Sequence, residues 1–223
     1  MTIDVSLELE SGDALGLFGG SGAGKSTVVA CIAGIEEPDD GFVELDNLKL
    51  FPPSLPLHRR PLGYMTQDAN LFPHLTVGEN VKFGIPKRMA PDGEHNQWIE
   101  TLRDHLQLGP LWSAPASRVS GGQARRVSLA RVLARKPPLV LLDEPFAGLD
   151  RQSIRELIDD LVLWSQTIGF SMIAVDHQAE VLQRLCPREA IVLERGRIVQ
   201  QGAWSELYNA PATPLLRSLL SPL

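Results

Sequence analysis

The sequence predicts an α/β domain built on a mostly parallel β-sheet, and three observations support this fold class. Strand candidates alternate with helix candidates along most of the 223 residues. Leu139–Leu142 is a continuous apolar run, which is typical of a strand buried on both faces of a parallel sheet. A glycine-rich loop, Gly19–Gly24, separates an apolar strand candidate from a helix candidate.

The first seventy residues predict several strands around one helix. Apolar residues alternate with polar ones from Ile3 to Leu9, which is the period of a half-buried strand. A helix is predicted from Thr27 to Ala33, and Gly34 is expected to end it. The other strand candidates in this part are Ala14–Phe18, Phe42–Leu45 and Leu62–Thr66.

The middle of the chain, roughly residues 72–118, is predicted to be a helical insertion. Thr76 and Glu79 form the pattern of a capping box for a helix that runs through Phe83. Residues 86–94 are expected to be loose. The apolar residues that then recur at helical spacing are Trp98, Leu102 and Leu106. We interpret this stripe as core packing.

The last part of the chain returns to alternating helices and strands. Ser120 is predicted to cap a helix that runs to about Arg135, and Asp150 to cap the next one. The apolar face of that second helix consists of Ile154, Leu157, Ile158 and Leu161. The remaining predictions are a strand at Ser171–Val175, a hairpin from Ile191–Leu193 through Arg195-Gly196, and short helices from Ala203 to Leu223.

The composition of the chain limits which partners it can bind and in which cellular compartment it is expected. The balance of 21 Lys+Arg against 27 Asp+Glu gives a net charge of −6, which argues against nucleic acid as a partner. Cys31 and Cys186 lack metal-ligand spacing and are predicted to be small buried residues. No apolar run approaches the about 20 residues of a spanning helix, and no signal-peptide pattern begins the sequence. We therefore expect a cytoplasmic chain, with any membrane-spanning helices supplied by another polypeptide.

Residues 19–26 fit the pattern GxxxxGK[ST] of a phosphate-binding loop. Its glycines let successive backbone N–H groups curl around phosphate oxygens, and the following helix adds its positive dipole end. Lys25 is expected to reach the β- and γ-phosphates, and Ser26 to place its hydroxyl on Mg²⁺. The candidate phosphate ligands are Gly19, Gly20, Ser21, Gly22, Ala23, Gly24, Lys25, Ser26 and Thr27.

Two carboxylates, Asp143 and Glu144, end the buried apolar run. Because neighbouring residues on a strand point in opposite directions, the two can serve different purposes. We expect Asp143 to hold Mg²⁺ through water, and Glu144 to act on an attacking water as general base or as the group that orients it. Alone, the pair would be interpreted as solvated charges at a strand end. The phosphate-binding loop upstream favours the catalytic interpretation.

The sequence Ser120-Gly121-Gly122-Gln123, between those two motifs, gives the chain the motif order of an ABC-transporter nucleotide-binding subunit, which it resembles over nearly its whole length. Val119 stands where the family more often has leucine. The resemblance implies a P-loop NTPase of the ABC cassette type, with an antiparallel N-terminal β part. It implies a RecA-like core at about 1–71 and 136–210 and a helical subdomain at about 72–135. Many of these relatives carry a C-terminal regulatory domain, but we expect none here because the sequence stops at Leu223.

The same resemblance implies further residues of an ATP site. The signature segment, Ser120–Gln123, would bind the γ-phosphate held by the phosphate-binding loop of a second copy, in a head-to-tail dimer. Gln67 matches the glutamine that senses Mg²⁺ and the attacking water. His177 matches the histidine that contacts the γ-phosphate. Asp150 matches the aspartate of the D-loop, in which Gly148 replaces the usual alanine.

The sequence departs from the family pattern at two places. The usual Thr-His-Asp around the histidine is Asp176-His177-Gln178 here, which leaves the chemistry beside His177 open. No aromatic residue occurs between Met1 and Leu17, where relatives stack the adenine. We therefore expect either that an adenine would rest on an aliphatic side chain such as Val5, or that recognition of the base is loose.

Residues 58–77 resemble the ATPases of bacterial importers for molybdate, sulfate, ferric iron, polyamines and sugars, and from Gln67 to Leu75 they are most similar to the molybdate type. This implies an ATPase that energises uptake of an oxyanion or another small solute. The implied partners are membrane permease subunits and an external solute-binding protein, with the chain on the inner face of the cell membrane. Phe72, Pro73 and His74 either line a groove for the permease's coupling helix or form an ordinary packed loop.

Other interpretations are weighed against the importer. A soluble ABC-type ATPase that remodels a non-membrane complex is the main alternative, but such relatives generally carry tandem cassettes or long coiled-coil insertions. A P-loop phosphotransferase or GTPase would leave the signature segment without a purpose, and the NKxD guanine motif is absent. A non-hydrolysing adaptor is disfavoured because Glu144 and His177 are both present.

Overall fold

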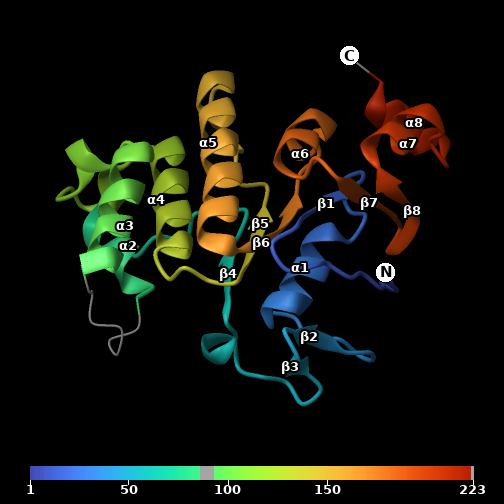
Figure 1. The fold of residues 1–223 in the computed structure, drawn as a ribbon, viewed down its shortest axis with the longest axis horizontal. Coiled ribbons are helices and arrows are strands. Elements are labelled where there is room, and N and C mark those ends of the chain that lie inside the picture. Colours follow the sequence, from blue (N-terminus) through green and yellow to red (C-terminus); the bar gives the residue numbers. More distant parts are fainter. Residues whose placement is uncertain (86–92, 222–223) are drawn as a thin grey trace.

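The computed structural model describes residues 1–85 and 93–221 and shows helices on both faces of a central sheet (Figure 1). Within these residues the sheet has the strand order β4-β5-β6-β1-β7-β8, and β2 and β3 form a separate antiparallel pair. The strands are β1 (Ala14–Phe18), β2 (Val43–Leu45), β3 (Leu48–Phe51), β4 (Leu62–Met65), β5 (Leu139–Asp143), β6 (Ser171–Val175), β7 (Glu189–Glu194) and β8 (Arg197–Ala203). The helices are α1 (Lys25–Ala33), α2 (Val77–Phe83), α3 (Gly93–His105), α4 (Gly121–Leu133), α5 (Arg151–Trp164), α6 (Ala179–Leu185), α7 (Trp204–Asn209) and α8 (Pro214–Leu220). The predicted fold class, a mostly parallel sheet with inserted helices and an antiparallel part, is confirmed.

Parallel pairing brings the ends of four strands to one edge of the sheet. β1 lies between β6 and β7 and runs parallel to both, with Leu15 opposite Ile173 and Glu189. β5 runs parallel to β4 and to β6. Because the carboxyl ends of parallel strands meet at the same edge, the segments that follow β1, β4, β5 and β6 lie next to one another.

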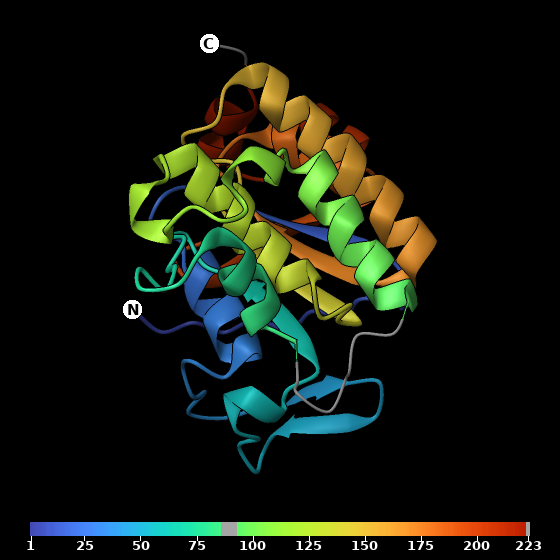
Figure 2. The same cartoon turned by 90° about the vertical axis from the view of Figure 1, so that its left-hand side faces the viewer.

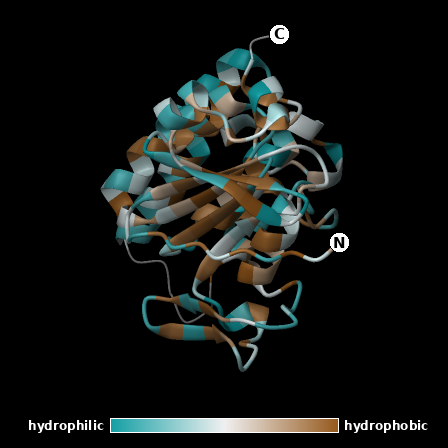
Figure 3. Ribbon diagram, turned by 90° about the vertical axis from the view of Figure 1, so that its right-hand side faces the viewer, coloured by the Kyte–Doolittle hydropathy of each residue, from teal (hydrophilic) through white to brown (hydrophobic). Residues whose placement is uncertain are grey.

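The sheet separates two clusters of buried apolar side chains. Along β5, Leu139 and Leu141 join the cluster that α1 covers, whereas Val140 and Leu142 join the cluster on the opposite face. This alternation follows from the pleat of a strand. The central strands therefore bury apolar side chains on both faces, which explains their continuous hydrophobic colour in Figure 3.

Helices α2, α3 and α4 pack together, and α3 lies alongside α5 (Figure 2). The predicted capping box of α2 is present. Trp98 is buried, its indole N–H donates to the carbonyl oxygen of Leu133 at 3.0 Å, and its ring meets Trp164 edge-on at 5.5 Å. Leu102 and Leu106 are fully buried. The interpretation of this stripe as core is confirmed.

The end of the chain also matches expectation. β7 and β8 form the predicted hairpin, whose turn residues Arg195 and Gly196 have positive φ. The tail forms the short helices α7 and α8. Of the stretch expected to be loose, residues 86–92 lie outside the described residues, as do residues 222–223 of the tail, while Gly93 and Glu94 already belong to α3.

The prediction of a strand from Ile3 to Leu9 is wrong. These residues carry one isolated bridge, between Asp4 and Arg197, and the Asp4 N–H donates to the carbonyl oxygen of Gly196 at 2.7 Å. The alternation itself has a physical basis, because the apolar residues from Ile3 to Leu9 are half-buried against the cluster beside α1. Side-chain burial sets the period here, without a continuous backbone ladder.

Strand β3 was not expected from the sequence. Asp46 and Asn47 both have positive φ, at 48° and 65°, and form a two-residue loop between β2 and β3. Turns of this kind match the twist of a hairpin and favour Asn, Asp and Gly. The Asp-Asn pair was therefore the signal for this hairpin.

In the described ranges, no helix has the length and apolarity needed to cross a bilayer. The same residues contain no group of three or more His, Cys, Asp or Glu side chains placed to hold a metal ion. Both cysteines are free, with Cys186 buried and Cys31 half-buried. Burial raises the pKa of the Cys186 thiol to about 12.

Candidate nucleotide-binding site

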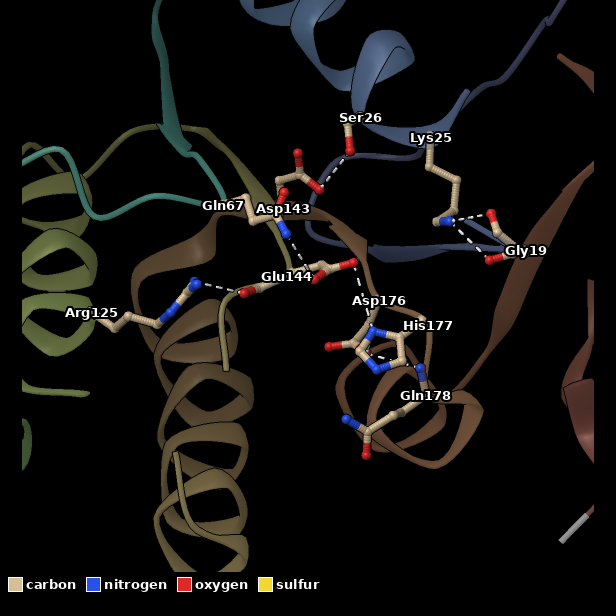
Figure 4. A network of polar contacts seen from close by, with 11 residues as sticks. Gly19, Lys25, Ser26, Gln67, Arg125, Asp143, Glu144, Asp176, His177 and Gln178 are labelled. Atoms are coloured by element: carbon tan, nitrogen blue, oxygen red, sulfur yellow. Dashed lines mark hydrogen bonds and ion pairs between the residues drawn. The ribbon is translucent and has the colours of Figure 1, made fainter. Parts of the chain in front are cut away.

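Residues that are far apart in the sequence converge at the carboxyl edge of the sheet (Figure 4). Lys25 follows the loop after β1, Gln67 follows β4, Glu144 follows β5 and His177 follows β6. The parallel topology thus brings together four of the motifs that the sequence singled out.

The loop from Gly19 to Gly24 has a backbone that side chains would disturb. Gly19, Gly22 and Gly24 have φ values of 147°, 74° and 106°, a region that residues with a Cβ rarely adopt. A Cβ at Gly19 would lie 2.3 Å from the carbonyl oxygen of Leu193. The glycine at this position is therefore required by a close backbone approach.

Lys25 folds back over this loop. Its Nζ donates to the carbonyl oxygens of Gly19 and Gly20 at 2.8 and 3.0 Å, and the side chain is buried. Burial lowers the pKa of the Lys25 ammonium, and the nearby carboxylates Glu144 and Asp143 oppose that shift. The ammonium is thus held at the loop by two bonds that an incoming anion could replace. Ser21 and Thr27 are exposed beside it.

Alanine at Gly19 should damage this loop, whereas alanine at Gly20 should be tolerated. A Cβ at Gly20 would meet nothing nearer than Leu215 Cδ2, at 3.8 Å. We expect Gly19→Ala to weaken ATP binding by at least about tenfold, equivalent to ~1.4 kcal/mol, because the loop must shift to relieve the overlap. Titration of both variants with a fluorescent ATP analogue checks this. Equal affinities for the two variants would contradict it.

Ser26 and Asp143 supply two oxygens side by side. The Ser26 hydroxyl donates to Asp143 Oδ1 at 3.1 Å. Burial raises the pKa of Asp143, and the hydrogen bond from Ser26 opposes the shift. Burial and the nearby Asp143 carboxylate raise the pKa of Tyr64 to about 12. Hydroxyl and carboxylate oxygens are the ligands that Mg²⁺ prefers, and an ion held by so few protein groups usually completes its shell with phosphate oxygens and water. The residues therefore fit Mg²⁺ delivered with a nucleotide.

The expectation that Asp143 and Glu144 are neighbours on one strand is wrong, because β5 ends at Asp143. The alternation of side chains along a strand therefore does not set the direction of the Glu144 side chain. Glu144 follows the end of β5 with a φ of 46°, in the left-handed region, and its N–H donates to the carbonyl oxygen of Val175 at 2.9 Å. Its carboxylate accepts from Gln67 Nε2 at 3.4 Å and lies 3.6 Å from His177 Nδ1 (Figure 4). The structure thus brings Gln67, Glu144 and His177 together.

His177 lies on the exposed side of this group, with a side chain that is 60% exposed. Its Nδ1 is 3.5 Å from Oδ1 of Asp176, which is buried. Burial raises the pKa of Asp176, and the N–H of Gln178, which donates to it at 2.9 Å, opposes the shift. At the two departures from the family pattern, the Asp176 carboxylate therefore accepts from the Gln178 backbone and also lies near the imidazole.

The signature segment forms the beginning of α4. Ser120 is the N-cap; its Oγ accepts from the Gln123 N–H at 3.3 Å, and Gln123 Oε1 accepts from the Ser120 N–H at 2.8 Å. Ser120 and Gly121 are exposed, and Gly122 and Gln123 are half-buried. α4 and α1 lie on separate parts of the molecule (Figure 1). The structure therefore does not bring the signature segment to the phosphate-binding loop of the same chain.

Asp150 caps α5, as the sequence predicts. One carboxylate oxygen accepts from the N–H groups of Gln152 and Ser153, and the other accepts from the Ser153 hydroxyl at 2.6 Å. Just before it, Gly148 has a φ of 78°, and Leu149 packs against Gly122 of the signature segment. Hydrogen bonds from Ser153 lower the pKa of Asp150.

The cap at Asp150 should make stability depend on pH. Because its folded-state pKa is lowered, the carboxylate stabilises the fold above its unfolded-state value of about 3.9, and that contribution is lost as the pH falls through the folded-state pKa. We expect the wild type to be more stable than Asp150→Asn at pH 7, with the difference disappearing in acid. Urea unfolding of both proteins from about pH 7 to pH 3 checks this. A difference that does not change with pH would contradict it.

Three buried or half-buried arginines were not singled out by the sequence. Arg125 donates to the Glu144 carbonyl oxygen at 2.8 Å. Arg131 donates to the carbonyl oxygens of Ala69 and Asn70, both at 2.9 Å. The fully buried Arg60 donates to backbone carbonyls around the end of α1. The sequence contains many arginines, and no local pattern distinguishes Arg60, Arg125 and Arg131 from the exposed ones.

The loop at Phe72 keeps both earlier interpretations open. The Phe72 ring packs on Phe83 at 4.3 Å and lies beneath the Arg131 guanidinium at 5.6 Å. Pro73 and His74 are exposed, and Phe83 is 61% exposed. The loop is thus anchored on one side and open on the other.

Similar proteins identify the family. Residues 3–147 match the ABC transporter family. A molybdate/tungstate import ATP-binding protein of Thermococcus kodakarensis is 37% identical over 94% of this chain, which spans 63% of the length of that relative. A probable sulfate/thiosulfate import ATP-binding protein of Chlorella vulgaris is 36% identical over 97% of this chain and 90% of its own length.

A solved structure agrees with this at the level of the fold. A dimeric ATP-binding cassette in a post-hydrolysis state, bound to ADP and Pi, superposes with a TM-score of 0.79 at 28% identity, covering 90% of this chain and 89% of its own. The sequence and the structure together show that the chain belongs to the ABC transporter family.

Proposed function

We propose that this chain is the ATP-binding and ATP-hydrolysing subunit of a membrane importer for a small solute, of which an oxyanion such as molybdate is the favoured class. The observation that carries the proposal is the convergence of Lys25, the Ser26–Asp143 pair and the Gln67–Glu144–His177 group at one sheet edge. The relatives named as import ATP-binding proteins support the coupling to uptake.

ATP would bind with its phosphates in the loop Gly19–Gly24, at the N-terminus of α1. Lys25 would exchange its bonds to the loop carbonyls for the β- and γ-phosphates. Ser26, Asp143 and Gln67 would hold Mg²⁺, which supplies positive charge that offsets the charge of the phosphates.

Hydrolysis would depend on the group around Glu144. Its carboxylate would orient the attacking water and accept a proton from it, and a positioned base of this kind contributes about 10²–10⁴ in rate. Gln67, which donates to that carboxylate, would fix its position. His177, exposed on the other side of the carboxylate, would contact the γ-phosphate.

A second copy would complete each ATP site. The exposed signature segment begins α4, and the backbone N–H groups of Gly121 and Gly122 at this helix start would face an anion. A head-to-tail dimer would place this segment and Asp150 against the ATP of the partner. The dimeric cassette bound to ADP and Pi supports such an assembly.

The further partners would be permease subunits in the membrane and an external solute-binding protein, with the chain on the inner face of the membrane. The regions 1–71 and 136–210 would form the nucleotide-binding core. The region 72–135, with Phe72–His74 on its surface, would form the helical subdomain that receives the permease's coupling helix.

Affinity purification tests the proposal. The tagged Glu144→Gln chain is isolated with ATP from detergent-solubilised membranes of its own cells. A Lys25→Ala control, which we expect to bind ATP more weakly, is treated in the same way, and both samples are analysed by mass spectrometry. We expect a multi-spanning subunit to be enriched with Glu144→Gln. Enrichment of soluble partners alone would overturn the importer in favour of an ATPase that remodels a soluble complex.

A further inference from the structure

Arg125 reaches from the signature helix to the backbone of Glu144. It lies on the first turns of α4, its side chain is half-buried, and its Nη1 donates to the Glu144 carbonyl oxygen at 2.8 Å (Figure 4). Among the described residues, Arg125 makes no ion pair with a carboxylate. Its cationic hydrogen bond is therefore directed at a neutral carbonyl, in contact with the residue whose carboxylate faces Gln67 and His177.

Glu144 needs external support because its backbone is in an unfavourable region. A φ of 46° is disfavoured for a residue with a side chain and persists only where the surroundings hold it. The Glu144 N–H is fixed by Val175 of β6, at 2.9 Å. On its other side the carbonyl accepts from Arg125, and at a longer 3.4 Å from the Ala147 N–H. Hydrogen bonds from a charged donor are stronger than neutral ones, so Arg125 is the principal anchor on this side.

The neighbouring arginines of α4 have different partners. Arg126 bonds Gln107 and Ser153, which fastens α4 to α5. Arg131 bonds the backbone of the loop that follows Gln67. The helix that begins with the signature segment is thus tied separately to the Glu144 backbone and to the Gln67 loop.

We infer that Arg125 is a positioning residue for hydrolysis: it fixes the backbone of Glu144 and thereby links the position of the signature helix to the placement of the Glu144 carboxylate. The inference rests on the proposed function, because it assigns Arg125 an effect on a reaction that Glu144 performs. Arg125 contacts the backbone of Glu144 and not its carboxylate, and it belongs to α4 and not to the phosphate-binding loop. Its loss should therefore affect turnover and leave nucleotide binding nearly intact.

The test compares Arg125→Ala, Arg125→Lys and Arg155→Ala in the purified chain. Arg155 is exposed on α5 and provides the same chemical change away from the site. We expect Arg125→Ala to lower kcat for ATP by about 10- to 100-fold, because small misplacements of a catalytic group have effects of that size. KM should stay within about threefold, since binding contacts are unchanged. Arg125→Lys, which keeps a cationic donor, should recover part of kcat, and Arg155→Ala should match the wild type.

A second measurement excludes a general loss of structure. In the Glu144→Gln background, Arg125→Ala should lower the residual rate by less than about threefold, because residues that act through one group are not additive. The inference is overturned if Arg125→Ala keeps wild-type kcat. It is also overturned if the fold-decrease in kcat of the double variant equals the product of the fold-decreases of Arg125→Ala and Glu144→Gln. A wild type that neither binds nor hydrolyses ATP would instead overturn the proposed function.

Discussion

Glu144→Gln should lower the rate of ATP hydrolysis by about 10²–10⁴-fold, because glutamine cannot accept the proton of the attacking water. Its side chain has nearly the same size, so the contacts with Gln67 and His177, at 3.4 and 3.6 Å in the wild type, should be retained in position. The phosphate-binding loop is unaltered. ATP binding should therefore persist, and the nucleotide should accumulate unhydrolysed between two copies.

Two measurements on the same protein check this expectation. Phosphate release gives the turnover, and size-exclusion chromatography with ATP gives the dimer fraction, which should rise above that of the wild type. Glu156→Gln makes the same chemical change on the exposed side of α5 and should behave like the wild type in both assays. Wild-type turnover in Glu144→Gln would show that another group handles the water.

Arg60→Met should destabilise the fold by at least about 3 kcal/mol, the cost of several buried polar groups left without a partner. The side chain is 1% exposed. Its guanidinium donates to four carbonyl oxygens, those of Leu55, Cys31, Ile32 and Leu50, at 2.9, 3.1, 2.7 and 3.2 Å. Two of these end α1, where a cation also complements the helix dipole. Methionine fills the volume but donates nothing.

The adjacent Arg59 provides the matched control, because it is exposed. Urea unfolding should give Arg60→Met a free energy of unfolding at least about 3 kcal/mol below that of Arg59→Met. The melting temperature of Arg60→Met should fall by about 6–12 °C at this chain length. Equal stabilities would mean that water or a rearranged backbone satisfies the four carbonyls. ATP affinity should be measured alongside, since α1 also carries Lys25 and Ser26 at its other end.

Local patterns sufficed for most elements. The apolar run of β5, the capping box at Thr76, and the caps at Ser120 and Asp150 depend on residues within a few positions of one another, and each is present in the structure. The strand prediction for Ile3–Leu9 was wrong because alternating apolar residues show only that one side of the segment is buried. A strand also needs a neighbouring strand to pair with along its length, and whether one is present depends on the whole fold.

In the candidate site, too, local motifs predicted the residues but not the contacts between distant ones. The motifs gave Lys25, Asp143, Glu144 and His177 as candidates, and their roles in hydrolysis stay predictions. The left-handed backbone of Glu144 could not be derived, because a pattern that ends a strand does not state the φ of the next residue. The bonds of Arg125 and Arg60 join residues brought together only by the fold. Long-range arginine contacts of this kind have no local sequence signal.

The central position of β1 has a consequence for how the protein is made. β1 is the first strand of the main sheet to leave the ribosome, yet its neighbours β6 and β7 follow roughly 160 residues later. At a synthesis rate of about 5–20 residues per second, the apolar segment Ala14–Phe18 waits for some 8–30 s before either partner exists. During that interval the nascent chain displays the strand that later carries the phosphate-binding loop. The centre of the main sheet can therefore close only after most of the residues between β1 and β7 have been translated.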